Sequence, residues 1–340
     1  MKTDTITKEY VKDTGVFADI FNFYIYGGRS MIQPGQLTER DTAKTALPYG
    51  ADDAVIPVQR FRDVQKLYAA MTDGKATYIL YGVENQTQIH YAMPVKNNLY
   101  DALEYAGQAE EAAKSHRRQK RPGDAPSAGE FLSGFWAGDR LIPSVTVTLF
   151  FGAEAWDGPL SLSDMMDVPD QNVCACMNDY KKHLIAPAQM ADDEIMRFQS
   201  SMREVLLFIK YSKDRAGLDR ILQANEGRFR ELERRAADVI EAVTKSGLKY
   251  EEGEEAVDMC QAIQEMRLEE RRLGKKEGER IGREEGERIG REEGQEMQAR
   301  ETSKRLYAIG LDIGAIAPAV GRTAETVRGW LGLADDLSNR

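Results

Sequence analysis

The sequence predicts an α/β protein with a helical C-terminal extension. Two runs rich in β-branched and aromatic residues, at 76–83 and 141–151, have the length and apolar character of buried strands. The segments around them carry apolar residues at the spacing of amphipathic helices. From 251 to 300 the chain is dense in charged residues and repeats itself. We therefore expect an α/β domain followed by a charge-rich extension of a different kind.

The N-terminal part predicts a helix, a pair of strands and a second helix. Residues 6–26 place apolar side chains at helical spacing, and the glycine pair 27–28 ends that helix. We expect a strand around 62–64, which a hairpin-type turn at 72–75 connects to the first apolar strand. The apolar face of the following helix, expected over 92–107, is formed by Leu99, Ala102, Leu103 and Ala106.

The middle of the chain predicts an exposed insertion, a buried strand and then helices. Residues 109–129 are charged and then rich in proline, glycine and serine, which indicates an exposed loop. The second apolar strand leads into a loop and a short helix near 162–166, and helices dominate from 192 to 245. We assign residues 1–245 to one domain.

Composition and charge limit the class of protein. The net charge is −10 and the pI is about 5.1, which argues against a protein that coats nucleic acid through bulk positive charge. We expect no membrane partner, because no apolar run approaches the roughly 18 residues of a membrane span. Cys174, Cys176 and Cys260 form no disulfide framework and the N-terminus is polar, so we expect a cytoplasmic protein.

A repeated, charge-dense segment occupies residues 246–300. The motif EGERIGRE at 277–284 recurs at 285–292, and a glycine stands at every fourth position from 274 to 294. In a helix this spacing gives a slowly drifting stripe of glycines beside Glu–Arg pairs. Each glycine costs a helix about 1 kcal/mol relative to alanine, so the helix alone is marginal. The segment is either a solvated helical spacer or the seam of a homo-oligomer.

Residues 301–340 predict a small helical module. Ala317, Gly321 and Val327 have the spacing of a helix-turn-helix, in which a small residue permits helix contact and glycine makes the turn. The module either binds DNA through its second helix or serves as a plain helical assembly unit. Its candidate DNA contacts are Arg322 and Arg328.

Two acidic residues mark the ends of neighbouring predicted strands. Asp63 belongs to one strand, and Glu84 directly follows the apolar strand over 76–83. Gln86, two positions further along, projects to the same face as Glu84. A charged residue at the end of a buried strand needs a partner, and hard carboxylate oxygens suit Mg²⁺ or Mn²⁺. The pattern therefore predicts a divalent-metal site held by Asp63 and Glu84.

Such a site suits the hydrolysis of phosphodiester bonds. Bound Mg²⁺ polarises a scissile phosphate and lowers the pKa of the water that attacks phosphorus. Gln86 can orient this water but brings no charge, so Lys96, in the following helix, is a candidate for the missing cation. His90 is a further candidate in support of the site, or else a structural histidine near the start of that helix.

Three stretches carry a likeness to a known family: FADIFNFYIYGG, FRDVQKLYAA and YILYGVENQTQIHYAMPVKNNLYDALEY. They resemble the Rpn family of recombination-promoting nucleases, whose members are also called transposases. The pieces FLSGFW, LIPSVTVTLFFGAEAWDGPLSL and MNDYKKHLI extend the likeness over most of residues 10–210 and, more loosely, the tail. The resemblance implies a PD-(D/E)XK nuclease: a restriction-endonuclease-like core, with a central mixed sheet flanked by helices, that cleaves DNA with a metal.

The resemblance also implies roles for individual residues. Asp63 corresponds to the motif aspartate and Glu84 to the motif glutamate. Gln86 stands where other nucleases have lysine, which is ordinary for this family. Asp19, on the first helix, matches an additional acidic residue of some members, or is a surface charge. Arg62 precedes Asp63 where the class name has proline, which is a departure from the pattern.

The sequence leaves three functions open. The first is a Mg²⁺-dependent endonuclease that acts on DNA in recombination or transposition. The second is a catalytically decayed nuclease-fold protein that assembles or binds DNA, an alternative that Gln86 keeps open. The third is a sequence-specific regulator that acts through residues 301–340. Lys66 and the basic run around His116 either contact the DNA backbone or are solvated side chains.

Overall fold

A computed structural model of the chain divides into two compact units, Met1–Gln264 and Glu265–Arg340. The structure describes residues 3–40, 43–46, 58–61, 63–72, 75–118, 126–167, 170–251 and 253–333. Among the described residues, no helix combines the length and the apolar character that crossing a membrane requires.

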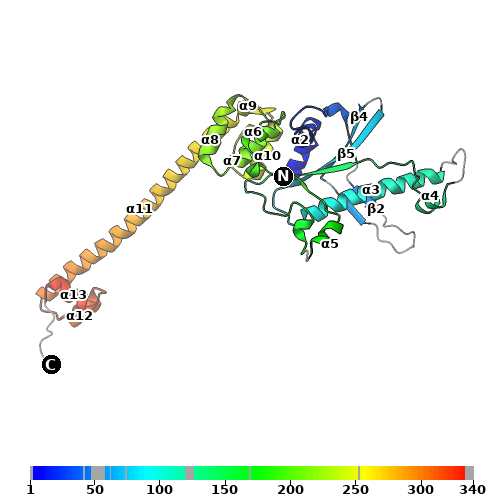
Figure 1. Cartoon of the computed structure of the whole chain (residues 1–340). Helices are drawn as coiled ribbons and strands as arrows, with labels where there is room; N and C mark the ends of the chain where they lie inside the picture. The colour runs from blue at the N-terminus through cyan, green and yellow to red at the C-terminus, as the bar shows by residue number, and fades with distance from the viewer. Residues whose placement is uncertain are drawn as a thin grey trace. The chain divides into compact units, whose positions relative to one another are not determined.

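A five-stranded mixed sheet forms the centre of the first unit (Figure 1). In spatial order its strands are β1 (Leu37–Glu39), β4 (Val64–Thr72), β5 (Lys75–Gln86), β6 (Ser144–Phe150) and β7 (His183–Ile185). β1, β4 and β5 run antiparallel, whereas β5, β6 and β7 are parallel. Thr72 pairs with Lys75 as the predicted hairpin requires, and the turn residues 73–74 lie outside the described ranges. The predicted mixed α/β fold is confirmed, and its assignment to the nuclease class stays a prediction.

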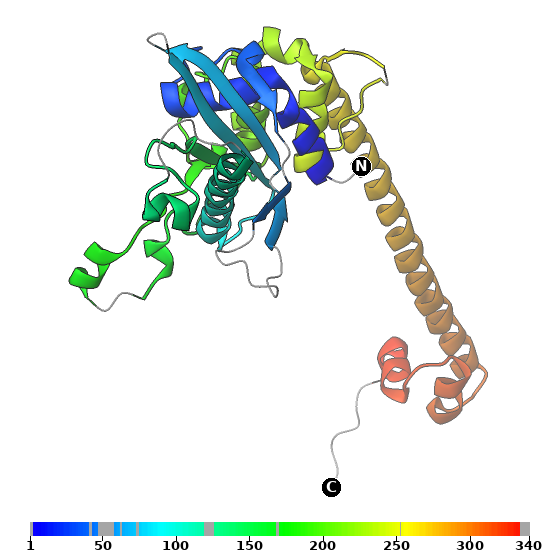
Figure 2. The same cartoon turned by 90° about the vertical axis from the view of Figure 1, so that its right-hand side faces the viewer.

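Helices cover both faces of this sheet (Figure 2). The covering helices are α1 (Thr3–Lys12), α2 (Thr14–Tyr26) and α3 (Met93–Arg118). On the α2 face, the rings of Phe21 and Tyr81 stack with centroids 4.3 Å apart. On the α3 face, Asp101 accepts a hydrogen bond of 2.9 Å from Thr146 of β6. Because alternate residues of a strand point to opposite faces, the even-numbered residues of β5, including Glu84, point toward α3.

The predicted helix over 6–26 is two helices, which corrects that expectation. The side chain of Asp13 caps α2, because its Oδ1 accepts hydrogen bonds from the backbone N–H groups of Gly15 and Val16. Gly27, with φ at 63°, ends α2 in the left-handed conformation, as predicted. Apolar residues continue at helical spacing on both sides of Asp13, so periodicity alone did not reveal the break.

The predicted exposed insertion over 109–129 is only partly a loop. α3 continues to Arg118, and the buried Ala113 gives its last turns a packing partner. α4 (Ala128–Ser133) begins at a capping box formed by Ser127 and Glu130. Residues 119–125 lie outside the described ranges. The charge-rich composition of this segment therefore belongs in large part to a helix surface.

The remaining helices of the first unit follow β6. They are α5 (Gln171–Cys176), α6 (Asp192–Ile195), α7 (Met202–Tyr211), α8 (Arg215–Ala224), α9 (Glu226–Arg230) and α10 (Arg234–Thr244). Short 3₁₀ turns lie at Pro34–Gln36, Ser163–Met165 and Pro187–Gln189. Two further antiparallel strand pairs are present. One joins β2 (Ala43–Ala46) to β3 (Val58–Phe61), and the other joins β8 (Leu232–Glu233) to β9 (Ala256–Val257). α10 packs against α1 and α7. The expected run of helices from 192 to 245 is confirmed.

The second unit contains most of α11 (Met259–Ala308) together with α12 (Ile313–Ala319) and α13 (Ala324–Leu331). The glycine repeat lies within α11, which is helical throughout. Ala317 and Val327 are buried against each other with Ile316, and Gly321 turns the chain with φ at 65°. The predicted spacing therefore corresponds to two helices that pack across a turn.

Candidate active site

The strand register brings Asp63 and Glu84 to the same end of the sheet. Val64 of β4 pairs with Val83 of β5, and Asp63 immediately precedes β4. Continuing this antiparallel register places Asp63 opposite Glu84. The hydrogen bond of 2.9 Å from the backbone N–H of Asn85 to Oδ2 of Asp63 fixes the position of the aspartate. The two predicted ligands are therefore neighbours, with Asp63 immediately before β4 and Glu84 within β5.

Glu84 is fully buried, and its charge is balanced by a lysine of α3. Nζ of Lys96 lies 2.9 Å from Oε2 of Glu84, whose side chain is 0% exposed. Burial by itself lowers the pKa of Lys96, but Glu84, with smaller contributions from Tyr100 and Asp63, raises that pKa above its usual value. Lys96 is therefore held as a cation beside Glu84.

Asp63 is balanced by a lysine of α1. Nζ of Lys8 lies 2.9 Å from Oδ1 of Asp63, which is 14% exposed. Burial opposes the charged form of Lys8, yet Asp63 and Asp4 raise its pKa above the usual value. The site therefore carries two carboxylates and two ammonium groups. The sequence did not predict Lys8 as part of this site, because only the packing of α1 against the sheet brings it to Asp63.

Gln86 ends β5 two residues beyond Glu84 and lies on the same face. Gln86 is partly buried, and its backbone carbonyl accepts a hydrogen bond of 2.8 Å from the N–H of Phe151. This bond extends the pairing of β5 with β6 to the end of both strands. The amide of Gln86 is thus carried on a fixed backbone, two residues beyond Glu84.

A polar layer joins α3 to the sheet around Glu84. Asn97 donates a hydrogen bond of 3.0 Å to Thr148, which stands beside Glu84 in the register of β5 and β6. Gln65 donates to Glu104 at 3.0 Å, and both side chains are buried. The predicted apolar face of this helix is only partly right: Leu103 is buried, but Leu99 and Ala102 are exposed and the buried face carries several polar residues.

Asp19 is buried in a different set of contacts. Its Oδ2 accepts hydrogen bonds from the N–H of Gln199 at 2.9 Å, the N–H of Ser200 at 2.8 Å and the hydroxyl of Ser200 at 2.6 Å. Asp19 is 5% exposed, so it is not a surface charge. These bonds hold the segment that leads into α7, and we leave Asp19 out of the proposed metal ligands.

Lys66 is not available to contact DNA, which corrects that expectation. Its side chain is 0% exposed, and its Nζ donates a hydrogen bond of 2.6 Å to the backbone carbonyl of Lys12. Burial lowers the pKa of Lys66 below its usual value. The ammonium also lies 5.4 Å from the centroid of the Phe17 ring. Lys66 thus supports the packing of α1 and α2 on the sheet.

The other predicted residues lie outside this cluster. His90 is exposed, and its backbone carbonyl accepts a hydrogen bond of 3.0 Å from Met93 at the start of α3. His116 contacts Asp139 at 2.8 Å and stacks on Trp136 with ring centroids 3.4 Å apart. Arg322 and Arg328 are exposed in the second unit. The structure brings together Asp63, Glu84 and Lys96, with Gln86 at the end of the same strand.

The donor set at this site fits a hard divalent cation with few protein ligands. In the described part of the chain, no cluster of three or more His, Cys, Asp or Glu side chains is arranged to hold a metal. Mg²⁺, however, commonly uses one or two carboxylates and completes its shell with waters and substrate phosphates. Asp63 and Glu84 supply two carboxylates from opposite strand positions. Mg²⁺ at this site therefore stays a prediction.

Comparisons with known proteins add no family assignment. No protein-family model, curated protein or solved structure matches the chain. The likeness to the Rpn nucleases therefore rests on the sequence stretches quoted above.

Proposed function

We propose that the first unit is a Mg²⁺-dependent endonuclease that hydrolyses phosphodiester bonds in DNA. The observation that carries the proposal is the position of Asp63, immediately before β4, opposite Glu84 of β5, with Nζ of Lys96 2.9 Å from Glu84. The resemblance to Rpn nucleases supports the same activity and suggests a role in recombination or transposition. DNA is the proposed partner, with Arg322 and Arg328 as candidate contacts of the second unit.

The residues divide the chemistry between them. Asp63 and Glu84 would hold Mg²⁺, which when bound supplies a Lewis acid for the phosphate and acidifies the attacking water. Lys96 places a positive charge beside Glu84, where it stabilises the negative charge that develops on the phosphate oxygens. Gln86 offers an amide that orients the attacking water without adding charge. Lys96 thus supplies the cation that the usual motif carries at the position of Gln86.

The charge balance of the site suits an anionic substrate. Lys8 and Lys96 neutralise the two carboxylates in the structure. A DNA phosphate offers both ammonium groups a second anionic partner when the carboxylates are engaged elsewhere. The same balance also explains how Glu84 is tolerated in a fully buried position, because a buried charge without a partner is strongly destabilising.

Nicking of supercoiled plasmid by the full chain tests the proposed function. We expect cleavage with Mg²⁺ or Mn²⁺ and no cleavage with EDTA. The rate of nicking should fall by about a hundredfold or more in Asp63→Ala and in Glu84→Ala, because each substitution removes a predicted metal ligand. Asp193→Ala removes an exposed carboxylate of α6 and serves as the matched control. Glu84→Gln, which keeps the shape of the side chain, distinguishes loss of chemistry from loss of fold.

Equal nicking by the wild type and both ligand variants would contradict the proposal. Absence of nicking by a folded wild-type protein would favour the second candidate, a nuclease-fold assembly or DNA-binding protein. The observation that favours this alternative is that lysines already neutralise both carboxylates.

Lys96 gives a second, independent prediction for the same site. We expect Lys96→Met to lower the rate of cleavage by about a hundredfold, because it removes the ammonium group that lies 2.9 Å from Glu84. Lys96→Arg should retain part of the rate. Lys114→Met, which removes an exposed lysine of the same helix, should leave the rate unchanged. A Lys96→Met protein as active as the wild type would exclude Lys96 from the chemistry.

A further inference from the structure

Two adjacent apolar side chains of α4 stand almost fully in solvent. Phe131 is 80% exposed and Leu132 is 88% exposed, and they are the most exposed large apolar side chains among the described residues. α4 lies beside the C-terminal end of α3, as Figure 1 shows. We call residues 127–140 the α4 lobe. Unlike scattered single residues, an exposed pair of neighbouring large apolar side chains indicates a contact with another molecule.

Specific contacts fix the α4 lobe to the end of α3. The ring of His116 stacks on Trp136 with centroids 3.4 Å apart, and its Nε2 lies 2.8 Å from Oδ2 of Asp139. Gly134 ends α4 so close to α3 that a Cβ at this glycine would lie 2.7 Å from the Cβ of Ala113. The apolar pair is therefore held in place before any partner arrives, which lowers the entropy lost on binding.

The two acidic side chains of the lobe are used to hold its own backbone. Oε2 of Glu130 accepts a hydrogen bond of 2.9 Å from the N–H of Ser127, and its Oε1 accepts one of 3.2 Å from the N–H of Ala137. Asp139 accepts a hydrogen bond of 2.7 Å from the N–H of Trp136 as well as facing His116. These carboxylates therefore stabilise the fold of the lobe.

Three exposed arginines lie at the same end of α3. Arg117 and Arg118 directly follow His116 in the last turn of the helix, and Arg140 directly follows Asp139. The chain as a whole has a net charge of −10, so this group of cations departs from its overall character. The planar guanidinium group matches the geometry of a phosphate and can bind it through two parallel hydrogen bonds. The lobe thus presents an apolar pair together with groups that suit phosphates.

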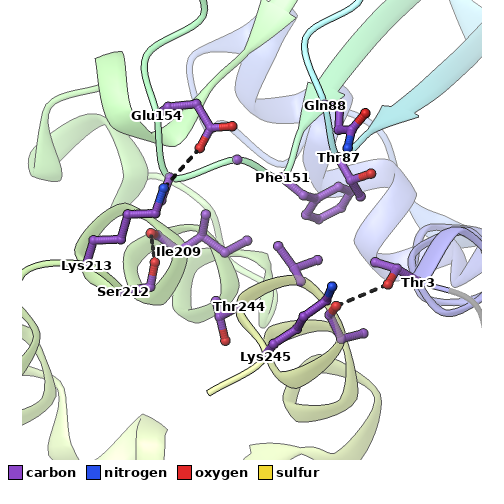
Figure 3. Close-up of a pocket in the computed structure, with 14 residues that line it drawn as sticks. Thr3, Thr87, Gln88, Phe151, Glu154, Ile209, Ser212, Lys213, Thr244 and Lys245 are labelled. Carbon is purple, nitrogen blue, oxygen red and sulfur yellow. Dashed lines mark hydrogen bonds and ion pairs between the residues drawn. The ribbon is translucent and has the colours of Figure 1, made fainter. Parts of the chain in front are cut away.

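The hollow beyond the ends of β5 and β6, with a volume of about 300 Å³, presents a different kind of surface (Figure 3). Phe151 and Ile209 belong to its lining but are 0% exposed. Its exposed Lys213 lies 3.6 Å from Glu154. We therefore place the contact with a partner at the α4 lobe.

We propose that the α4 lobe binds double-stranded DNA by inserting Phe131 and Leu132 as a wedge between base pairs, with the three arginines on flanking phosphates. Inserted Phe and Leu side chains partly unstack a base step and kink the duplex by about 20–90°. Two side chains offer far less surface than the roughly 800 Å² per partner of a stable protein interface, so the pair suits a wedge better than a protein partner. The inference rests on DNA as the partner in the proposed function, but it does not require cleavage.

DNA binding by the full chain in EDTA tests the wedge in the absence of cleavage. The probe is a duplex of about 20 base pairs with 2-aminopurine at a flexible TA step and a fluorescent dye at each end. We expect binding to raise the fluorescence of 2-aminopurine, because the base is unstacked, and to increase energy transfer between the dyes, because the duplex is bent. The double variant Phe131→Ser, Leu132→Ser should lose both signals and bind at least tenfold more weakly.

A second double variant, Arg117→Gln with Arg118→Gln, tests the phosphate contacts. Its affinity should fall, and the slope of log K against log salt concentration should become shallower by about 2, because each phosphate contact contributes about 0.9. Both double variants should keep the melting temperature of the wild type, because the replaced side chains are exposed. Leu160→Ser, which replaces a 52% exposed leucine outside the lobe, should leave the affinity and both signals unchanged. Phe131→Leu should retain the kink.

The test separates the wedge from the proposed cleavage. Glu84→Gln should bind and bend DNA as the wild type does, so a failure of the nuclease proposal leaves this result intact. Four results would overturn the wedge: no binding of the duplex by the wild type, binding without either signal, wild-type behaviour of the Phe131→Ser, Leu132→Ser variant, or loss in that variant of binding to anionic phospholipid vesicles with its DNA signals unchanged. The last result would assign the apolar pair to a membrane surface.

Discussion

Lys182→Met is expected to stabilise the first unit by about 2–4 kcal/mol at pH 6. Lys182, just before β7, is 6% exposed, and its Nζ lies 3.5 Å from the centroid of the Trp156 ring. Within the described ranges, this Nζ has no hydrogen-bond partner. Burial lowers the pKa of Lys182 to about 7. Methionine keeps the contact with the indole and removes the cost of burying a cation.

The stabilisation should depend on pH in a defined direction. Between pH 7 and 10.5 the unfolded chain holds a proton on Lys182 that the folded chain has released, so the stability of the wild type rises with pH over this range. The advantage of Lys182→Met is therefore largest below pH 7 and vanishes as the pH approaches 10.5. Urea unfolding of both proteins at several pH values measures this difference.

A surface lysine provides the control for this prediction. Lys181 is exposed beside Lys182, so Lys181→Met should change the free energy of unfolding little at any pH. Two results would contradict the prediction: a Lys182→Met protein that is less stable than the wild type, or a difference in the free energy of unfolding that is the same at pH 6 and pH 10. Either result would show that burial of the Lys182 amine does not destabilise the wild type.

Replacing the repeat glycines of α11 by alanine is expected to have the largest effect in the second unit. The six glycines at 274, 278, 282, 286, 290 and 294 have open space where a Cβ would stand, so alanine introduces no clash. Each replacement favours the helix by about 1 kcal/mol, or about 6 kcal/mol in sum. Hydrogen exchange of the full chain should show much slower exchange of the amides over 274–294.

The same variant distinguishes the two interpretations of the repeat. A four-residue spacing rotates each glycine by about 40° from the last, so six glycines turn through about 200° around α11. One straight partner helix cannot contact all of them. Arg280 and Arg288 each contact glutamates one turn before and one turn after, as a solvated helix allows. We therefore expect an unchanged oligomeric state by light scattering; dissociation of an oligomer would instead indicate a packed seam.

Local patterns predicted β4, β5 and β6 and the neighbouring carboxylates, but not the short strands β1 and β7 of the same sheet. The apolar run before Glu84 predicted β5, and the hairpin turn set the register that places Asp63 opposite Glu84. Register follows directly from a short turn, which explains why two residues 21 positions apart could be paired from sequence. Lys96 was also identified, because it follows β5 closely on α3.

Features that depend on long-range packing were not predictable in this way. Lys8 reaches Asp63 only because α1 packs on the sheet, and Lys66 is buried for the same reason. The buried face of α3 was misassigned, because Asn97 and Glu104 have polar partners on other elements that no local pattern reveals. The break at Asp13 was missed because apolar spacing continues across it.

The polar contacts beneath α3 restrict that helix to one axial position. Apolar side chains tolerate small displacements, whereas Lys96–Glu84, Asn97–Thr148 and Asp101–Thr146 each require a particular donor beside a particular acceptor. A shift of α3 by one residue moves its two donors, Lys96 and Asn97, and its acceptor, Asp101, by about 1.5 Å along the axis and breaks the three pairs together. The position of the Lys96 ammonium group is therefore fixed partly by Asn97 and Asp101, which are not proposed to contact the substrate.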